Sequence, residues 1–467
     1  MAIRGRNFPV PTTEGTVALV IGLALAWGTI SNDLLPSKML GQVAVPLGIA
    51  LVGSALFDLQ LGWRNLFRVD LVCLVTLYYL TFAEFLYPQP GFNQVVTAKA
   101  AAQAAEMVLL GFAGLAVGRH LTVLKPASRK WLNFQNIPDE SLFRLLLIAA
   151  LLGYLWVLMS ANFNPVEIIE GYIAPRFSRP WSQGAMGGWS SLLTELELMR
   201  YAIPPLAAII WNRRCFLPRW KVAITIVILG FVLFLGVASG TRTIFASYLI
   251  GFLVAYLLTL ERLSIWKVGA PVALSGYAMF LATRHMLAFR NMGLKNYIKR
   301  GEYAEVAQQE SLQIDFNLRA ITQLVQAMPE RYDFLGWEVP FVFATKPVPR
   351  VLWPAKPEGL SVSIEQITGA EGWTVSTTYI GEVYMMGGTL AVIAFSLALG
   401  ALATWWSRIT FQQQTGYGVA VATVGFFVAA TSMRSLVFTT TNMLPILALI
   451  VLAKFTPGLL GMRSRQL

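Results

Sequence analysis

Apolar residues along this chain are grouped into long runs separated by short polar connections. A helix needs ~20 residues to cross the hydrocarbon core of a bilayer. Since only helices and closed barrels satisfy their backbone in lipid, and alternating barrel strands are absent, the pattern predicts an all-α polytopic membrane protein. The predicted spans are twelve, at 14–30, 41–57, 70–87, 100–118, 142–160, 197–212, 221–238, 243–260, 266–284, 379–405, 417–433 and 437–456.

Two connections are much longer than the others, 161–196 and 285–378. Connections of this length usually carry function. The predicted organisation is an N-terminal transmembrane bundle over 1–284, a large extracytoplasmic loop over 285–378, and a C-terminal bundle over 379–467. Inside the large loop, apolar residues recur at helical spacing and predict one helix face packed on the bundle: Ile314, Leu318, Ile321, Val325 and Met328.

Composition agrees with a membrane class, because 56% of residues are hydrophobic and only 13% are charged, whereas soluble proteins average about a quarter charged. A net charge of +12 would suggest nucleic acid in a soluble protein. Here every even-numbered connection is basic, which is typical of cytoplasmic loops. We therefore expect no nucleic acid partner, both termini in the cytoplasm, and the long loops outside. The basic residues include Arg64, Arg68, Arg119, Arg213, Arg214, Arg262, Arg408 and Lys454.

Metal and disulfide chemistry are not indicated by the sequence. The two cysteines, Cys73 and Cys215, fall on distant segments, and there are only two histidines, His120 and His285. Such a set does not suggest a zinc site, and no Asp-x-Asp pair suits a sugar-nucleotide metal. We expect no metal and no cofactor.

The outward connections are nevertheless rich in arginine, against the usual sparseness of cations outside. Arg242 ends the short turn Ser239-Gly240-Thr241-Arg242, and Arg434 marks the last outward turn. These arginines either pair with acids of the loops and lipid phosphates, or bind a designated anion. An arginine at the edge of an apolar span is costly, and its planar fork suits phosphate.

The segment Pro347–Pro357 contains Arg350, Trp353 and Lys356 between prolines. In an extended polyproline conformation Arg350 and Lys356 would lie about 19 Å apart, too far to grip one diphosphate. Either the segment turns, or one cation, with Arg350 favoured, makes the contact. Trp353 suits either sugar stacking or an interfacial anchor.

The segment Gly381–Gly388 enters the tenth span and contains Glu382 and Tyr384. A carboxylate at a helix start either complements the helix dipole or is poised for chemistry near the arginines.

Taken in order, the Ser-Gly-x-Arg turn at 239–242, Pro-Arg-x-x-Trp-Pro-x-Lys-Pro at 349–357 and Gly-Glu-x-Tyr-x-x-x-Gly at 381–388 resemble the oligosaccharide repeat-unit polymerase (O-antigen polymerase, Wzy-type) family. The resemblance covers about 239–390. One departure is Thr241, where the family usually has serine, and the hydroxyl is kept.

The resemblance implies a bundle related to lipid-dependent (GT-C-like) glycosyltransferases in a bacterial cytoplasmic (inner) membrane. It implies joining of undecaprenyl-diphosphate-linked oligosaccharide units at the outer leaflet by metal-independent glycosyl transfer. The expected partners are the lipid-linked substrate, membrane lipid and a chain-length regulator.

Within this interpretation, each candidate residue has an expected role. Sugar binding is assigned to Trp353 and Tyr384, and the general base is His285 or Glu382, with Asp315 and Glu365 as weaker candidates. Transfer to another acceptor by an O-antigen ligase, or non-catalytic transport of lipid-linked sugars, are the alternatives. The diphosphate is assigned to Arg242, Arg290, Arg350 and Arg434.

Overall fold

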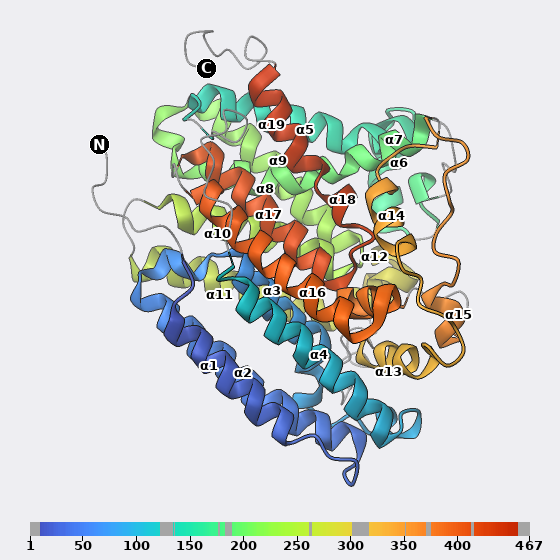
Figure 1. Ribbon diagram of the computed structural model, residues 1–467. Helices are drawn as coiled ribbons and strands as arrows, with labels where there is room; N and C mark the ends of the chain where they lie inside the picture. The colour runs from blue at the N-terminus through green and yellow to red at the C-terminus, as the bar shows by residue number, and fades with distance from the viewer. Residues whose placement is uncertain are drawn as a thin grey trace.

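A computed structural model gives the fold, and every element of regular secondary structure in its described residues is helical (Figure 1). The structure describes residues 10–121, 134, 136–175, 178–182, 189–260, 264–300, 317–350, 352–369, 375–411 and 415–455.

Eight of the described helices are long and apolar enough to cross a membrane, judged by length and composition. They coincide with eight of the twelve predicted spans. These helices are α2 (Pro36–Gln60), α4 (Ala98–Gly118), α5 (Asp139–Ser160), α9 (Arg219–Ala238), α10 (Arg242–Thr259), α11 (Ile265–Met292), α16 (Thr378–Phe411) and α17 (Gly416–Arg434).

Shorter helices occupy the other four predicted ranges: α1 (Thr13–Gly28), α3 (Val69–Thr81), the 3₁₀ segment η7 (Glu197–Ala202) with α8 (Ile203–Asn212), and α18 (Thr439–Asn442) with α19 (Leu444–Phe455). The prediction of one helix over 70–87 is wrong at its end. Helix α3 stops at Thr81, and the carbonyl of Leu80 accepts a hydrogen bond from Asn317 Nδ2 at 2.9 Å. A side chain from another helix thus satisfies a terminal carbonyl of α3.

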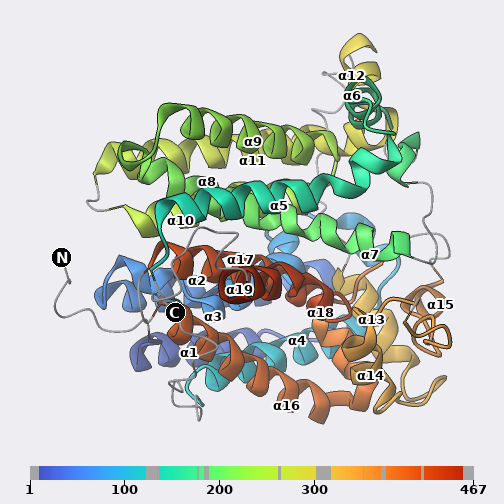
Figure 2. The same cartoon turned by 90° about the horizontal axis from the view of Figure 1, so that it is seen from above.

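The short helices gather at one end of the bundle, which we call the outer end (Figures 1 and 2). Helix α1 begins and α19 ends toward the opposite, inner end. The outer elements are α6 (Pro165–Ile173), α7 (Trp189–Leu196), α12 (Leu294–Arg300), α13 (Asn317–Ala327), α14 (Glu338–Thr345) and α15 (Ile364–Thr368).

The predicted apolar face is confirmed on α13, where Leu318 and Ile321 are buried and Val325 is partly buried; Met328, directly after the helix, is buried too. Ile314 lies outside the described residues. The helix packs on α4 and α16, so this part of the loop is anchored to the bundle.

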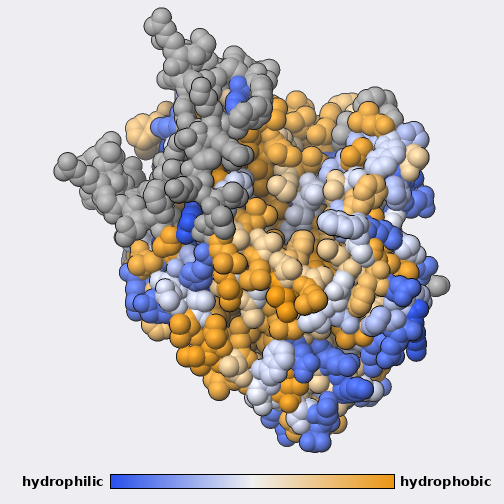
Figure 3. Space-filling model, in the orientation of Figure 1, coloured by the Kyte–Doolittle hydropathy of each residue, from blue (hydrophilic) through white to orange (hydrophobic). Residues whose placement is uncertain are grey.

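Large apolar side chains are exposed along the flanks of the bundle. Leu25 is 60% exposed, Ile49 68%, Val227 71% and Leu274 70%. Figure 3 shows apolar residues over much of one face, with polar ones gathered toward its lower right. Water would make so much apolar surface unfavourable, whereas lipid accepts it. The surface therefore agrees with a helical membrane protein.

A network of four buried charges ties the helices together at the inner end. Arg68 Nη2 lies 2.7 Å from Asp58 Oδ2, and Arg68 Nε lies 3.0 Å from Asp70 Oδ1. Arg119 Nη1 lies 4.0 and 3.9 Å from the same two carboxylates. Arg68 and Arg119 lie in two of the connections predicted to be basic, but both side chains are fully buried.

Polar contacts extend this network to the neighbouring helices. The backbone N–H and hydroxyl of Thr12 donate to Asp58 Oδ1 at 2.8 and 2.7 Å. Arg119 Nε donates to Thr16 Oγ1 at 3.0 Å, and Val69 N donates to Ser407 Oγ at 2.9 Å. Helices α1, α2, α3, α4 and α16 are thereby joined.

Removing one partner of the network should destabilise the protein strongly, because it leaves an uncompensated buried charge. We expect Asp58→Asn and Arg68→Ala each to lower the free energy of unfolding by about 3–5 kcal/mol. The measurement is denaturation of the purified protein in detergent. Arg144→Ala is the control, since its pair with Glu140 is about two-fifths exposed and should contribute about 0–1 kcal/mol. Equal effects at the two sites would contradict a special role for the network.

Candidate functional site

Arg242 and Arg434 lie at the same end of two antiparallel helices. Arg242 is the first residue of α10 and Arg434 the last of α17. The ring of Tyr201 lies between these helices, 5.1 Å from the ring of Tyr248 and 3.6 Å from that of Phe427. Arg242 is six residues from Tyr248, and Arg434 is seven from Phe427. At ~1.5 Å per residue, Arg242 lies about 9 Å and Arg434 about 10.5 Å beyond these rings, toward the outer end.

The turn before Arg242 is fixed by local hydrogen bonds. Gly240 has φ +64°, a conformation that favours glycine. Ser239 Oγ donates to the carbonyl of Gly236 at 2.7 Å and accepts from Thr241 N at 3.1 Å. Arg179 Nη2 donates to the carbonyl of Ala238 at 2.7 Å. The Ser-Gly-x-Arg pattern is therefore a rigid turn, and Arg179 holds the end of α9.

Glu382 holds the backbone that follows Arg434. Ser435 Oγ donates to Glu382 Oε1 at 2.5 Å, and Leu436 N donates to Glu382 Oε2 at 2.5 Å. Ser376 Oγ donates to the carbonyl of Arg434 at 2.6 Å. Glu382 is only 3% exposed, and both of its oxygens are engaged. This geometry positions Arg434 rather than presenting a carboxylate to a substrate.

The glycines of the Gly-Glu-x-Tyr pattern break α16 into two parts. Gly387 and Gly388 leave helical geometry, and Gly388 has φ +66°. The freed carbonyls of Met385 and Met386 accept hydrogen bonds from Leu335 N at 2.8 Å and Gly336 N at 3.0 Å. The large loop is thus fastened to the first part of α16.

Tyr384 takes part in the same attachment. Its hydroxyl donates to the carbonyl of Met328 at 3.2 Å, and its ring meets Phe334 edge-on at 5.7 Å. With 7% exposure, Tyr384 faces the loop instead of an open surface.

The proline-rich segment turns back on itself, the first of the two alternatives that the sequence left open. The carbonyl of Pro349 accepts from Leu352 N and Trp353 N. Lys356 Nζ donates to the carbonyls of Lys346 at 2.7 Å and Val348 at 2.9 Å. The Trp353 ring packs edge-on against Phe341 of α14 at 6.0 Å.

This turn brings cations toward the end of α17. Lys346 Nζ lies 5.4 Å from the ring centre of Phe438, and Thr440 Oγ1 donates to the carbonyl of Phe343 at 2.6 Å. We call Lys346, Arg350, Lys356 and Arg434 the outer cationic cluster. Burial lowers the pKa of the Lys356 ammonium, and the charges of Lys346 and Arg350 lower it further, as expected where positive groups crowd together.

Arg350 is the member of this cluster that is most open to an anion. Its side chain is 44% exposed, and its Nη1 lies 3.4 Å from Glu358 Oε1. Glu358 is itself 91% exposed, so a phosphate could displace this weak surface pair.

His285 and Arg290 lie on helix, not in the loop as predicted. Helix α11 continues past the predicted end at 284 to Met292. His285 Nδ1 lies 2.8 Å from Tyr297 Oη. The neighbouring Met286 shares a small buried cluster with Phe245 of α10, so His285 lies near the Arg242 end of α10. The side chain of Arg290 lies outside the described atoms.

The two candidate bases, His285 on α11 and Glu382 on α16, lie far from each other in the bundle. Figure 2 shows α11 and α16 on opposite sides of the bundle. Of the weaker base candidates, Glu365 is partly buried on α15, and Asp315 lies outside the described residues.

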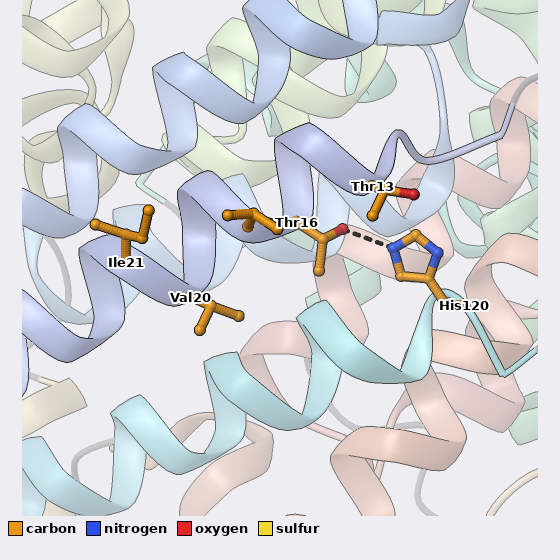
Figure 4. Close-up of a pocket in the computed structure, with 6 residues that line it drawn as sticks. Thr13, Thr16, Val20, Ile21 and His120 are labelled. Atoms are coloured by element: carbon orange, nitrogen blue, oxygen red, sulfur yellow. Dashed lines mark hydrogen bonds between the residues drawn. The ribbon is translucent and has the colours of Figure 1, made fainter.

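Two surface hollows lie away from the outer cationic cluster. One, of ≈ 250 Å³, lies between α1 and the end of α4, where His120 Nε2 is 2.6 Å from Thr16 Oγ1 (Figure 4). The other, of ≈ 890 Å³, is an open groove lined by α1, α2 and residues 85–89. The first adjoins the buried ion network, and neither contains an outer arginine.

The fold and this cation-rich end define a helical protein with membrane-crossing helices and a structured loop region. Residues 316–454 match the model of a family described as a domain of unknown function (DUF8712). This match contains the loop from α13 onward and the C-terminal helices, hence the whole outer cationic cluster. No curated protein and no solved structure matches the chain.

Lys346 belongs to the outer cationic cluster but was not among the predicted site residues. It directly precedes Pro347, so its place beside the motif was visible. Its contact with Phe438, however, depends on how α14 packs against α18, which no local pattern specifies.

Adding a methyl group at Gly388 should loosen the loop. A side chain there would adopt an unfavourable positive φ, and its Cβ would lie 3.0 Å from the Phe334 ring. We expect Gly388→Ala to cost about 1–3 kcal/mol and to speed proteolysis within 317–369. Gly230→Ala in α9 is the control, since nothing lies within 4 Å of its added Cβ. Unchanged cleavage of the Gly388 variant would show that this attachment does not hold the loop.

Proposed function

We propose that this protein is a glycosyltransferase that polymerises lipid-diphosphate-linked oligosaccharide units at the outer leaflet of a bacterial cytoplasmic membrane. The observation that carries the proposal is the convergence at the outer end of cations from separate elements. Arg434 ends α17, Arg350 and Lys356 lie on the turned proline-rich segment, and Arg242 begins α10, which packs against α17.

Fixed guanidinium groups suit the departure of a lipid diphosphate. When the bond between the anomeric carbon and the phosphate oxygen breaks, negative charge collects on the diphosphate. Positive groups that are already in position stabilise this charge without reorganising, commonly the largest contribution to catalysis. In this scheme Arg242, Arg350 and Arg434 bind the diphosphate, and Glu382 keeps the Arg434 turn in place through Ser435 and Leu436.

The proposal includes a twelve-span arrangement related to lipid-dependent (GT-C-like) glycosyltransferases, with both termini in the cytoplasm. Three shorter apolar helices and the segment 197–212 then complete the bundle beside the eight long helices. The outer end, with its short helices and cations, would face the lipid-linked substrate. A chain-length regulator would approach from the same side.

The charge of the arginines alone should not suffice, because diphosphate binding uses their two-pronged geometry. Replacement by lysine keeps the charge but removes the bidentate fork. We expect Arg242→Lys and Arg350→Lys each to lower polymer formation at least about 10-fold, equivalent to ~1.4 kcal/mol of lost transition-state binding. The measurement is the length of lipid-linked glycan in cells with matched protein levels.

The control for these variants is Arg331→Lys, an exposed arginine of the same loop that lies outside the cluster. It should leave polymer length unchanged. Long polymer from the Arg242 or Arg350 variant would return that arginine to a role in lipid contact or ion pairing. If cells lacking the protein elongate normally but fail to transfer finished polymer to its final acceptor, a ligase is indicated instead.

The proposed topology predicts opposite labelling of two cysteines. Glu358→Cys replaces a side chain that is 91% exposed at the outer end, and the native Cys215 is exposed at the inner end. In intact cells an impermeant thiol reagent should label position 358 and leave Cys215 unlabelled until lysis. The reverse pattern would invert the orientation.

A further inference from the structure

We infer that Glu195 of α7 is the general base that takes the proton of the acceptor hydroxyl in the proposed transfer. This inference rests on the proposed function and adds to it a residue from the second long loop, 161–196. Glu195 is not among the residues that the sequence alone marks as candidates. Its assignment comes from the way the two loops meet at the outer end.

The chain direction places Glu195 at the level of the arginines. Helix α8 runs parallel to α10, because Tyr201 lies beside Tyr248 and, farther along, Asn212 Nδ2 donates to the carbonyl of Tyr256 at 2.8 Å. Glu195 precedes Tyr201 by six residues, just as Arg242 precedes Tyr248 by six. Glu195 therefore lies toward the outer end, as the first residue of α10 does.

The charged neighbours of Glu195 belong to the outer cationic cluster. Lys346, at the end of α14, and Lys356, in the proline-rich segment, act electrostatically on its carboxylate. In return, the negative charge of Glu195 raises the pKa of the Lys356 ammonium. Along the sequence, the next charged residues are Glu197 and Arg200, which pair with each other. Glu195 thus brings a negative group to the place where the proposed diphosphate binds.

Three other carboxylates of the outer end are either hydrogen-bonded or almost fully exposed, unlike Glu195. Within the described part of the structure, its carboxylate takes part in no hydrogen bond, and the side chain is partly buried. Both oxygens of Glu382 are engaged. Glu338 accepts from the hydroxyl of Ser361 at 2.7 Å, and Glu358 is almost fully exposed.

The chemistry balances with Glu195 as the base. The acceptor hydroxyl oxygen forms a bond to the anomeric carbon of the donor glycan while the bond from that carbon to the phosphate oxygen breaks. The electron pair leaves on the diphosphate, and the hydroxyl proton passes to Glu195, which later releases it to water. Burial raises the pKa of Glu195, against the opposing effect of Lys346 and Lys356, and a pKa nearer the working pH suits a base.

The test uses the full-length protein in lipid nanodiscs, with lipid-diphosphate oligosaccharide isolated from the cells that make it. Glu195→Gln should lower turnover about 10²–10⁴-fold while the affinity for the lipid-linked donor is kept. A base must be deprotonated, so wild-type turnover should fall as the pH drops through the raised pKa of Glu195. In the Gln variant this acid limb should disappear.

Matched variants separate this role from others. Glu170→Gln, an exposed carboxylate of α6 in the same loop, should keep wild-type turnover. If Glu195 only balances the lysines, adding Lys346→Gln to Glu195→Gln would restore turnover and overturn the inference. Near-normal turnover of Glu195→Gln beside an active wild type would also overturn it and leave the proposed function standing. An inactive wild type would overturn both.

Discussion

The arrangement of this bundle depends on the buried network of Asp58, Arg68, Asp70 and Arg119. Each charge would be costly alone in a low-dielectric interior, and the four together sum to zero. Asp58 ends α2, Arg68 and Asp70 begin α3, and Arg119 follows α4. Removing any one of these residues would leave another charge buried without an ion-pair partner. The inner ends of these helices must therefore assemble together. The packing of apolar side chains could tolerate a shift of one helix along another, but this network cannot.

A fixed inner end has consequences at the outer end. Val69 at the start of α3 donates to Ser407 of α16, so α16 is also held at its inner part. Its outer part is a separate short helix beyond Gly387 and Gly388, and it carries Glu382 and Tyr384. Glu382 holds the turn after α17, and Tyr384 holds the large loop. The outer cations therefore occupy defined positions relative to helices that the buried network holds at the inner end.

The sequence was sufficient for the eight long apolar helices, because long apolar runs have one physical solution in lipid. Of the predicted diphosphate ligands, Arg242, Arg350 and Arg434 lie at the outer end, and their role stays a prediction. The sequence failed where partners came from distant segments. Arg68 and Arg119 resembled loop cations because their carboxylate partners lie on other elements. Likewise, no pattern in 381–388 reveals that the oxygens of Glu382 are taken by residues 435 and 436.

Glu195 is a second case in which the sequence could not reveal a residue's surroundings. Nothing within 161–196 marks this carboxylate, since its cationic neighbours are about 150 residues away in the chain. Its position follows only once the parallel course of α8 and α10 is known. Long-range proximity of this kind requires the fold, whereas the turn at Gly240 required only its own four residues.

The broken helix and the buried charges bear on the alternative of a transporter. Transporters often bind their cargo at the open ends of discontinuous helices near the bilayer midplane. In α16 the break lies about ten residues from the outer end, ~15 Å along the axis. Its free carbonyls at Met385 and Met386 are already occupied by Leu335 and Gly336. The buried charges neutralise one another at the inner end and do not line a path. Both features have structural partners within the described residues, so neither resembles the substrate site of such a transporter.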